Sequence, residues 1–187
     1  MVTKMEALGM LELSSIAVAF QVQDTMLKAA DVQLLVARTI CSGKYIVMVG
    51  GDVAAVESSV REGKRVSREA LIDELVIPNV DARVFPAISG GVTLDDGDRD
   101  ALGILEAFSV TSIIEGADAA VKAARVKLFR IHVAMAIGGK GFLMLTGEVS
   151  EVNAAIEAGA KEIAKRGLLV SKVVIPRPEE RLYREVI

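Results

Sequence analysis

The chain has 187 residues, a formal net charge of −3 and a single cysteine, Cys41. Its basic residues are scattered along the sequence, so the clustered positive surface of a nucleic-acid binder is not expected. Charged residues make up 25% of the chain and interrupt every apolar run before the roughly 18 residues that a membrane span needs. The first residues do not read as a secretion signal. We therefore expect a cytoplasmic protein with no nucleic-acid partner and no membrane partner.

Hydrophobic residues make up 52% of the sequence, which is a high share for a chain without a membrane span. Soluble monomers rarely expose large contiguous apolar patches unless those patches are contact surfaces. We therefore expect other copies of the chain to cover part of this surface. The lone cysteine has no partner for an internal disulfide, which fits a reducing compartment.

One module occurs twice in the sequence. Ala-Leu-Gly-Met-Leu-Glu at positions 7–12 returns as Ala-Leu-Gly-Ile-Leu-Glu at 101–106, and Lys-Ala-Ala at 28–30 returns at 122–124. The separation between equivalent residues of the two copies is 94 at these motifs, 96 at the Gly-Lys pairs and 98 at the closing Val-Ile-Pro. The insertions thus fall in loops, which tolerate them better than cores do. We predict two domains, residues 5–96 and 97–187.

The first copy predicts six elements in the order strand, helix, two strands, helix and strand. Strand-like apolar runs and helical spacings of three and four residues place them at 7–13, 15–30, 32–40, 45–49, 52–63 and 71–77. Asp52 is a natural N-cap for the second helix. A linker follows, in which Ser89-Gly90-Gly91 precedes Asp95-Asp96-Gly97-Asp98.

The second copy repeats this order. It predicts a strand at 101–106, a helix capped by Ser109 or Thr111 and ending near Arg125, a hairpin of strands 126–137 and 142–145, a helix from 149 to Arg166, and a strand at 168–175. The order β-α-β-β-α-β is that of the ferredoxin-like α/β (α+β) class, in which helices cover one face of a mainly antiparallel sheet. We predict two such domains in tandem.

The sequence offers little for catalysis. His132 is the only histidine and lies in an alternating strand with no nucleophile or carboxylate at a useful spacing. We expect it to be a hydrogen-bonded strand residue. The Gly-Lys pairs lack the spacing of a phosphate-binding loop, and no zinc, calcium or dinucleotide motif occurs. We do not expect an enzyme.

Cys41 is the unusual residue. It lies at the predicted tip of the first hairpin, and its counterpart in the second copy is Ile137. A lone cysteine is often buried and inert. A turn lies at the surface, however, and the nearby Arg38 and Lys44 favour the thiolate that binds metal. A single thiolate binds a metal only weakly. Three thiolates brought together by threefold symmetry would suit an iron-sulfur cluster, zinc or cuprous copper.

Each half of the chain resembles the bacterial microcompartment shell domain. The resemblance rests on the repeated Ala-Leu-Gly-(Met/Ile)-Leu-Glu, on Lys-Ala-Ala at Lys28 and Lys122, on Gly-Asp-Val or Gly-Glu-Val before the second helix, and on Ile-Pro-Arg-Pro at 175–178. These motifs cover nearly the whole chain, twice over and in fixed order. The tandem arrangement, with Cys41 before the first Ser-Gly-Lys turn, is similar to that of tandem shell proteins from propanediol-utilisation compartments.

The resemblance implies a homotrimer of tandem domains that forms a flat pseudohexagonal tile. Such tiles pack edge to edge with other shell proteins and enclose a metabolic compartment within the bacterial cytoplasm. One 4Fe-4S cluster per trimer would be held by three Cys41 thiolates, which leaves one iron for an outside ligand. The family's tile-edge contacts match Lys28, Lys122 and Arg177. The family's central pore is lined by hairpin loops, which here match Cys41, Ser42, Gly43, Ile137, Gly138 and Gly139.

Three functions stay open at this point. The first is a shell tile whose pore holds the cluster, for electron transfer across the shell or cluster supply to encapsulated redox enzymes. The second is a shell tile without a cluster, whose glycine- and serine-rich loops pass a small polar metabolite. The third is a tandem ferredoxin-like regulator that binds an effector between its halves. Related tiles serve propanediol, ethanolamine and other pathways, so the resemblance leaves the encapsulated chemistry open.

Overall fold

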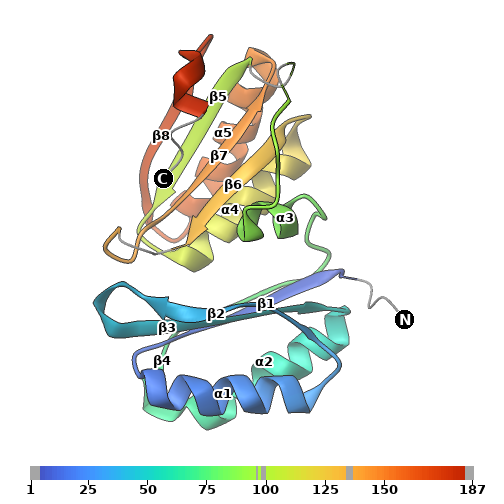
Figure 1. Cartoon of the computed structure of the whole chain (residues 1–187), viewed down its shortest axis with the longest axis vertical. Helices are drawn as coiled ribbons and strands as arrows, with labels where there is room; N and C mark the ends of the chain where they lie inside the picture. Colours follow the sequence, from blue (N-terminus) through green and yellow to red (C-terminus); the bar gives the residue numbers. More distant parts are fainter. Residues whose placement is uncertain (1–4, 96, 98–99, 134–136, 184–187) are drawn as a thin grey trace. The chain divides into compact units, whose positions relative to one another are not determined.

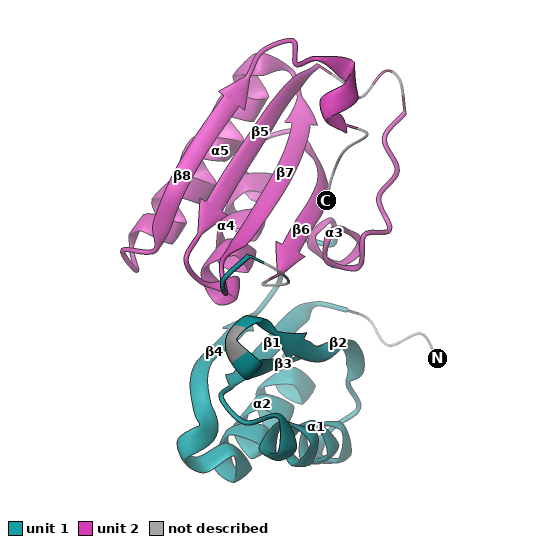
Figure 2. Ribbon diagram, turned by 60° about the vertical axis from the view of Figure 1, so that its left-hand side comes forward, with its two compact units in different colours: residues 1–82, 135–138 teal, residues 83–134, 139–187 magenta. Residues whose placement is uncertain are grey.

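The structure is a computed structural model that describes residues 5–95, 97, 100–133 and 137–183. The chain divides into two compact units, shown in different colours in Figure 2. Unit 1 runs to Ala82 and includes residues 137 and 138, whereas unit 2 begins at Arg83. The domain limits 5–96 and 97–187 follow the sequence repeat and stay a prediction, since residues 83–95 are grouped with unit 2.

Unit 1 is a four-stranded antiparallel sheet with two helices on one face (Figure 1). Its strands lie in the order β2-β3-β1-β4. Because β3 runs antiparallel to both β1 and β2, helix α1 connects two parallel strands, which is the split βαβ arrangement. The strands are β1 Ala7–Leu13, β2 Gln33–Ile40, β3 Lys44–Gly51 and β4 Leu71–Ile77, and the helices are α1 Ile16–Ala29 and α2 Val53–Ser67.

Unit 2 repeats the same topology with the strand order β6-β7-β5-β8. Its two long helices again lie on one face of the sheet (Figure 1). The predicted ferredoxin-like βαββαβ fold, present twice, is therefore confirmed. The strands are β5 Ala101–Ala107, β6 Lys127–Val133, β7 Gly141–Gly147 and β8 Leu169–Ile175, and the long helices are α4 Val110–Ala123 and α5 Val149–Ala164.

Several element ends differ from the prediction. Helix α2 continues to Ser67, and β6 ends at Val133, with residues 134–136 of the predicted strand outside the described part of the chain. A short helix that was not predicted, α3 Val84–Ser89, lies in the segment before the linker and stops at Gly90, whose φ is 71°. Six residues are too few for a helical period to stand out in a sequence. Among the described residues, every helix is too short or too polar to span a bilayer.

Side chains fix the starts of three long helices. The hydroxyl of Ser15 accepts a hydrogen bond from the amide of Val18 in α1, and the hydroxyl of Ser109 accepts one from the amide of Ser112 in α4. The distance between nitrogen and oxygen is 3.4 Å in both. The carboxylate of Asp52 accepts the amide of Ala55 at 2.9 Å, which confirms the predicted cap of α2. Each cap satisfies a first-turn amide that has no partner within its helix.

The glycine of each Ala-Leu-Gly motif lets the second helix lie close to the central strand. A Cβ added at Gly9 would come within 2.5 Å of Val60 and 2.7 Å of Val56 on α2. A Cβ at Gly103 would lie 2.8 Å from Ile156 on α5. All three distances are too short for real carbon contacts, so the repeated glycine is a packing requirement of the fold.

Replacement of Gly103 by alanine should therefore destabilise unit 2. Overpacking of a filled core costs about 1–3 kcal/mol, because neighbouring side chains and the helix must shift. Gly97→Ala is the matched control, since nothing lies within 4 Å of a Cβ there. Thermal unfolding followed by circular dichroism should give a lower midpoint for Gly103→Ala than for Gly97→Ala. Equal midpoints would argue against the packing role.

Candidate functional site

The first hairpin ends in a tight turn that carries Cys41. Strands β2 and β3 close with Ile40 opposite Lys44, and the residues between them form a single 3-10 turn, Cys41–Gly43. Gly43 has a φ of 72°, and nothing lies within 4 Å of a Cβ built on it. Cys41 is half-buried. The tip is thus an open turn in which the cysteine retains access to solvent, which agrees with the predicted surface position.

The second hairpin tip differs in length and in side chains. Its strands close with Val133 opposite Gly141, and the tip includes Ile137, Gly138 and Gly139. Gly138 and Gly139 have φ values of 67° and 86°, a left-handed region that residues with a Cβ rarely adopt. The glycines are therefore required by the turn. The position of Cys41 is taken by Ile137, which cannot ligate a metal.

A carboxylate on the central strand, buried in unit 1 and half-buried in unit 2, anchors each tip. The amine of Lys44 lies 2.8 Å from Glu12, and that of Lys140 lies 2.5 Å from Glu106. Glu12 is only 5% exposed, in a strand that is otherwise apolar. The buried Glu12 needs a paired cation, so Lys44 is tied to the central strand of its sheet. Lys140 makes the same contact with the half-buried Glu106.

Sequence reasoning missed both glutamates, although a charged residue at the same place in two apolar strands was a usable signal. The pairing also corrects one step of the argument for Cys41. Because the charge of Lys44 is compensated by Glu12, this lysine offers less support to a thiolate at the tip than its position in the sequence indicated. Arg38 of β2 remains as the other nearby cation.

One chain alone does not provide a metal site in its described part. There, no group of three or more histidine, cysteine, aspartate or glutamate side chains is arranged to hold an ion. His132 lies in β6, as predicted, and stacks on Phe142 with ring centroids 5.0 Å apart. Among the described tip residues Cys41 is the soft ligand, and a cluster there would require cysteines from further copies of the chain.

The predicted edge residues lie at the opposite end of each unit. In unit 2, Ala107 pairs with Gly141 at the hairpin end, whereas Ile175 pairs with Leu102 at the far end, just before Arg177. Arg177 has a φ of 53°. In unit 1 the equivalent Asn79 has the same φ of 53°. The two repeats therefore share this turn, even though the arginine is absent from the first.

Both edge lysines belong to ion pairs within their helices. Lys28 lies 2.7 Å from Asp24 in the last turns of α1, and Lys122 lies 2.6 Å from Asp118 in α4. The spacing of four residues places each pair on one helix face. The aspartates were not singled out from the sequence. They orient each lysine at the end of the unit that lies away from the hairpin.

Loss of the Glu12 carboxylate should loosen the first hairpin. We expect Glu12→Gln to reduce the free energy of unfolding by about 2 kcal/mol, the range for a hydrogen bond to a charged group. Asp24→Asn removes an exposed pair and should cost less than about 0.5 kcal/mol. Chemical denaturation compares the two variants. Equal losses would contradict the anchoring role of Glu12.

Known proteins share the sequence and the fold of both units. The BMC domain family matches residues 7–80 and 101–178. Over 97% of its length the chain is 46% identical to the bacterial microcompartment shell protein PduT of Citrobacter freundii, of which it covers 98%. The crystal structure of a microcompartment protein from Desulfitobacterium hafniense is 46% identical, with a TM-score of 0.92 and coverage of 97% of this chain and 99% of that one.

A more distant structure shares the fold alone. A fused permuted hexameric shell protein from the RMM microcompartment is 21% identical, with a TM-score of 0.60 and coverage of 86% and 82% of the two chains. The comparisons confirm the predicted tandem shell domains and the predicted place in a microcompartment shell. They lend no support to the ligand-binding regulator. The chain belongs to the BMC domain family of bacterial microcompartment shell proteins.

Proposed function

We propose that three copies of the chain form a pseudohexagonal shell tile whose central pore holds one 4Fe-4S cluster on three Cys41 thiolates. The observation that carries this proposal is the place of Cys41 in an open turn at the tip of the first hairpin. A cysteine with only a packing role would be expected inside the sheet. At a tip, its sulfur can meet the sulfurs of symmetry-related copies.

Assembly into a closed ring is supported by an imbalance between the repeats. Phe20 and Ile16 on α1 are 60% and 39% exposed, whereas their counterparts on α4, Ile114 and Val110, are fully buried. The same helix face is thus covered in one repeat and open in the other. A ring of three chains would cover the open copy, as expected for an exposed apolar surface in a shell protein.

The chemistry of the proposed site follows from the ligand count. Three thiolates satisfy three of the four irons, so the fourth iron takes water or a ligand from outside the chain. When bound, the cluster supplies one-electron transfer across the shell or clusters for encapsulated redox enzymes. The protein holds the thiolates at the tip, while the Glu12–Lys44 pair fixes the strand that follows.

The tile edge is the second part of the proposal. Lys28, Lys122 and Arg177 lie at the ends of the units away from the hairpins, where neighbouring shell proteins would pack. A lysine held by an aspartate one turn earlier can lay its alkyl stem along a neighbouring tile and reach its backbone carbonyls. The similarity to PduT supports a compartment of the propanediol-utilisation type as part of the same proposal.

Replacement of Cys41 by serine should remove the cluster and leave the tile intact. Protein purified without oxygen should be brown, contain roughly four iron atoms per three chains, and give an electron paramagnetic resonance signal that changes with dithionite. Cys41→Ser should be colourless and iron-free, because serine lacks the soft ligand. Analytical ultracentrifugation should find a trimer for both proteins.

Two results would contradict the cluster. Iron that persists in Cys41→Ser would mean that other residues hold it. A wild-type trimer without iron under the same conditions would favour the alternative tile, whose glycine-rich tips leave the pore open to a small polar metabolite.

A further inference from the structure

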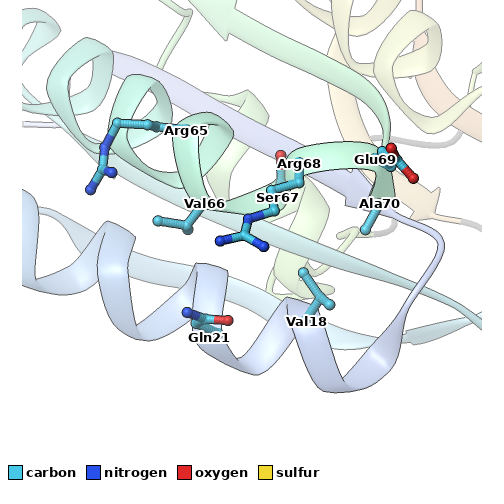
Figure 3. Close-up of a pocket in the computed structure, with 8 residues that line it drawn as sticks. All are labelled: Val18, Gln21, Arg65, Val66, Ser67, Arg68, Glu69 and Ala70. Carbon is cyan, nitrogen blue, oxygen red and sulfur yellow. The ribbon is translucent and has the colours of Figure 1, made fainter.

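Unit 1 has a second candidate site on its helix face, separate from the hairpin tip. A cavity of about 560 Å³ lies between the first turns of α1 and the end of α2 (Figure 3). This volume is within the range of small-molecule sites. The residues around it that matter for its chemistry are Val18, Gln21, Arg65, Val66, Arg68 and Glu69.

Arg68 gives this cavity an uncompensated positive charge. No described residue accepts a hydrogen bond from its guanidinium or forms an ion pair with it. The guanidinium extends toward Val18 and Gln21 of α1 in Figure 3. The neighbouring Arg65 is engaged, since it lies 2.9 Å from Glu62. Glu69 borders the cavity, but its carboxylate points away from Arg68 in the same view.

The backbone at Arg68 is also strained. Its φ and ψ are 49° and −128°, a conformation that L residues rarely adopt. In unit 2 the left-handed φ falls one position later, at Gly167, with a φ of 68°, so a glycine and not an arginine adopts it there. Glycine at position 68 would remove the strain in unit 1. Strain of this kind is concentrated at binding sites, where the geometry serves a ligand.

Unit 2 indicates which ligand suits this position. Arg166 stands 98 residues after Arg68, the offset that relates Leu169 to Leu71 in the closing strands. Its guanidinium donates to Glu115 at 3.3 Å and to Thr111 at 3.0 Å. The residue of unit 1 that corresponds to Glu115 is the uncharged Gln21. The arginine of unit 1 has therefore lost the internal carboxylate that its counterpart binds.

We propose that the Arg68 cavity binds the carboxylate of a small organic acid. The guanidinium takes the carboxylate in the place that Glu115 fills in unit 2, since a planar guanidinium suits two parallel hydrogen bonds. The Gln21 amide offers a further donor, and Val18 and Val66 supply an apolar wall for a short carbon chain. The cavity lies in unit 1 and does not include Cys41, so the proposal stands whether or not the pore holds a cluster.

The cavity lies at the hairpin end of unit 1. The amide of Ser14 donates to the carbonyl of Ala70 at 2.8 Å, and Leu13 pairs with both Tyr45 and Leu71. These contacts bring the start of α1 and the end of α2 to the same end of the sheet as the tip. A carboxylate bound there would lie at the same end of unit 1 as the tip that carries Cys41.

Saturation-transfer NMR on the full-length protein with sodium lactate tests the site at constant ionic strength. Wild type should give a lactate signal, and Arg68→Gln should reduce it at least fivefold. Gln21→Glu should also abolish the signal and raise the melting temperature, because it restores the internal pair seen in unit 2. Inorganic phosphate as competitor distinguishes a general oxyanion site, which displaces lactate, from a carboxylate-selective one.

Arg166→Gln is the matched control, since it removes the equivalent arginine that is already paired. It should lower the melting temperature and leave lactate binding unchanged. The proposal fails if wild type gives no lactate signal, or if Arg68→Gln and Gln21→Glu bind lactate as well as wild type does. It also fails if Arg68→Gln alters the oligomer in ultracentrifugation without any change in lactate binding, since Arg68 would then be an interface residue.

Discussion

The ion pair between the central strand and the hairpin is the contact on which the proposed site depends. Glu12 is almost fully buried and reaches Lys44, the first residue after the tip, and the half-buried Glu106 reaches Lys140 in unit 2. A carboxylate inside an apolar sheet is tolerated only with its partner in place, so the pair fixes where the returning strand begins. The position of Cys41 follows from that constraint. A hairpin without this anchor could slide in register and carry its tip away from a shared axis.

The duplication gives two domains with one backbone fold, and the proposed function depends on side chains that differ between them. The two domains share the same strand order, the same glycine under the second helix and the same anchored hairpin. Cys41 in the first copy corresponds to Ile137 in the second, and Phe20 on α1 corresponds to Ile114 on α4. A single repeat in a sixfold ring would place six identical residues at the pore. A tandem chain in a ring of three allows a soft ligand to alternate with an inert one.

Periodicity and the internal repeat were sufficient to predict most of the fold. Strands β1 and β4 begin and end at the predicted residues, because apolar alternation in one copy was checked by the other. Helix α3 could not be predicted from its own short sequence. Its place depends on tertiary contacts, including bonds from Arg83 to the carbonyl oxygens of Val121 and Val126. Such long-range contacts leave no pattern in a local sequence window.

The candidate site was predicted in part. Strand order puts the tip residues and the proposed edge residues at opposite ends of the sheets, and their roles in a pore and at a tile edge stay predictions. The partners of those residues were not predicted, because Glu12 is 32 residues away from Lys44 in the chain. The Arg68 cavity also has no sequence motif. It becomes visible only when the ion pair of Arg166 in unit 2 is compared with the same place in unit 1.

Native mass spectrometry of the assembly, prepared without oxygen, tests the central claim most directly. The account predicts one species with the mass of three chains plus a single 4Fe-4S cluster, which loses the cluster as a unit on activation. Trimers that carry no metal, or chains that each carry their own metal after dissociation, would contradict a site shared by three cysteines.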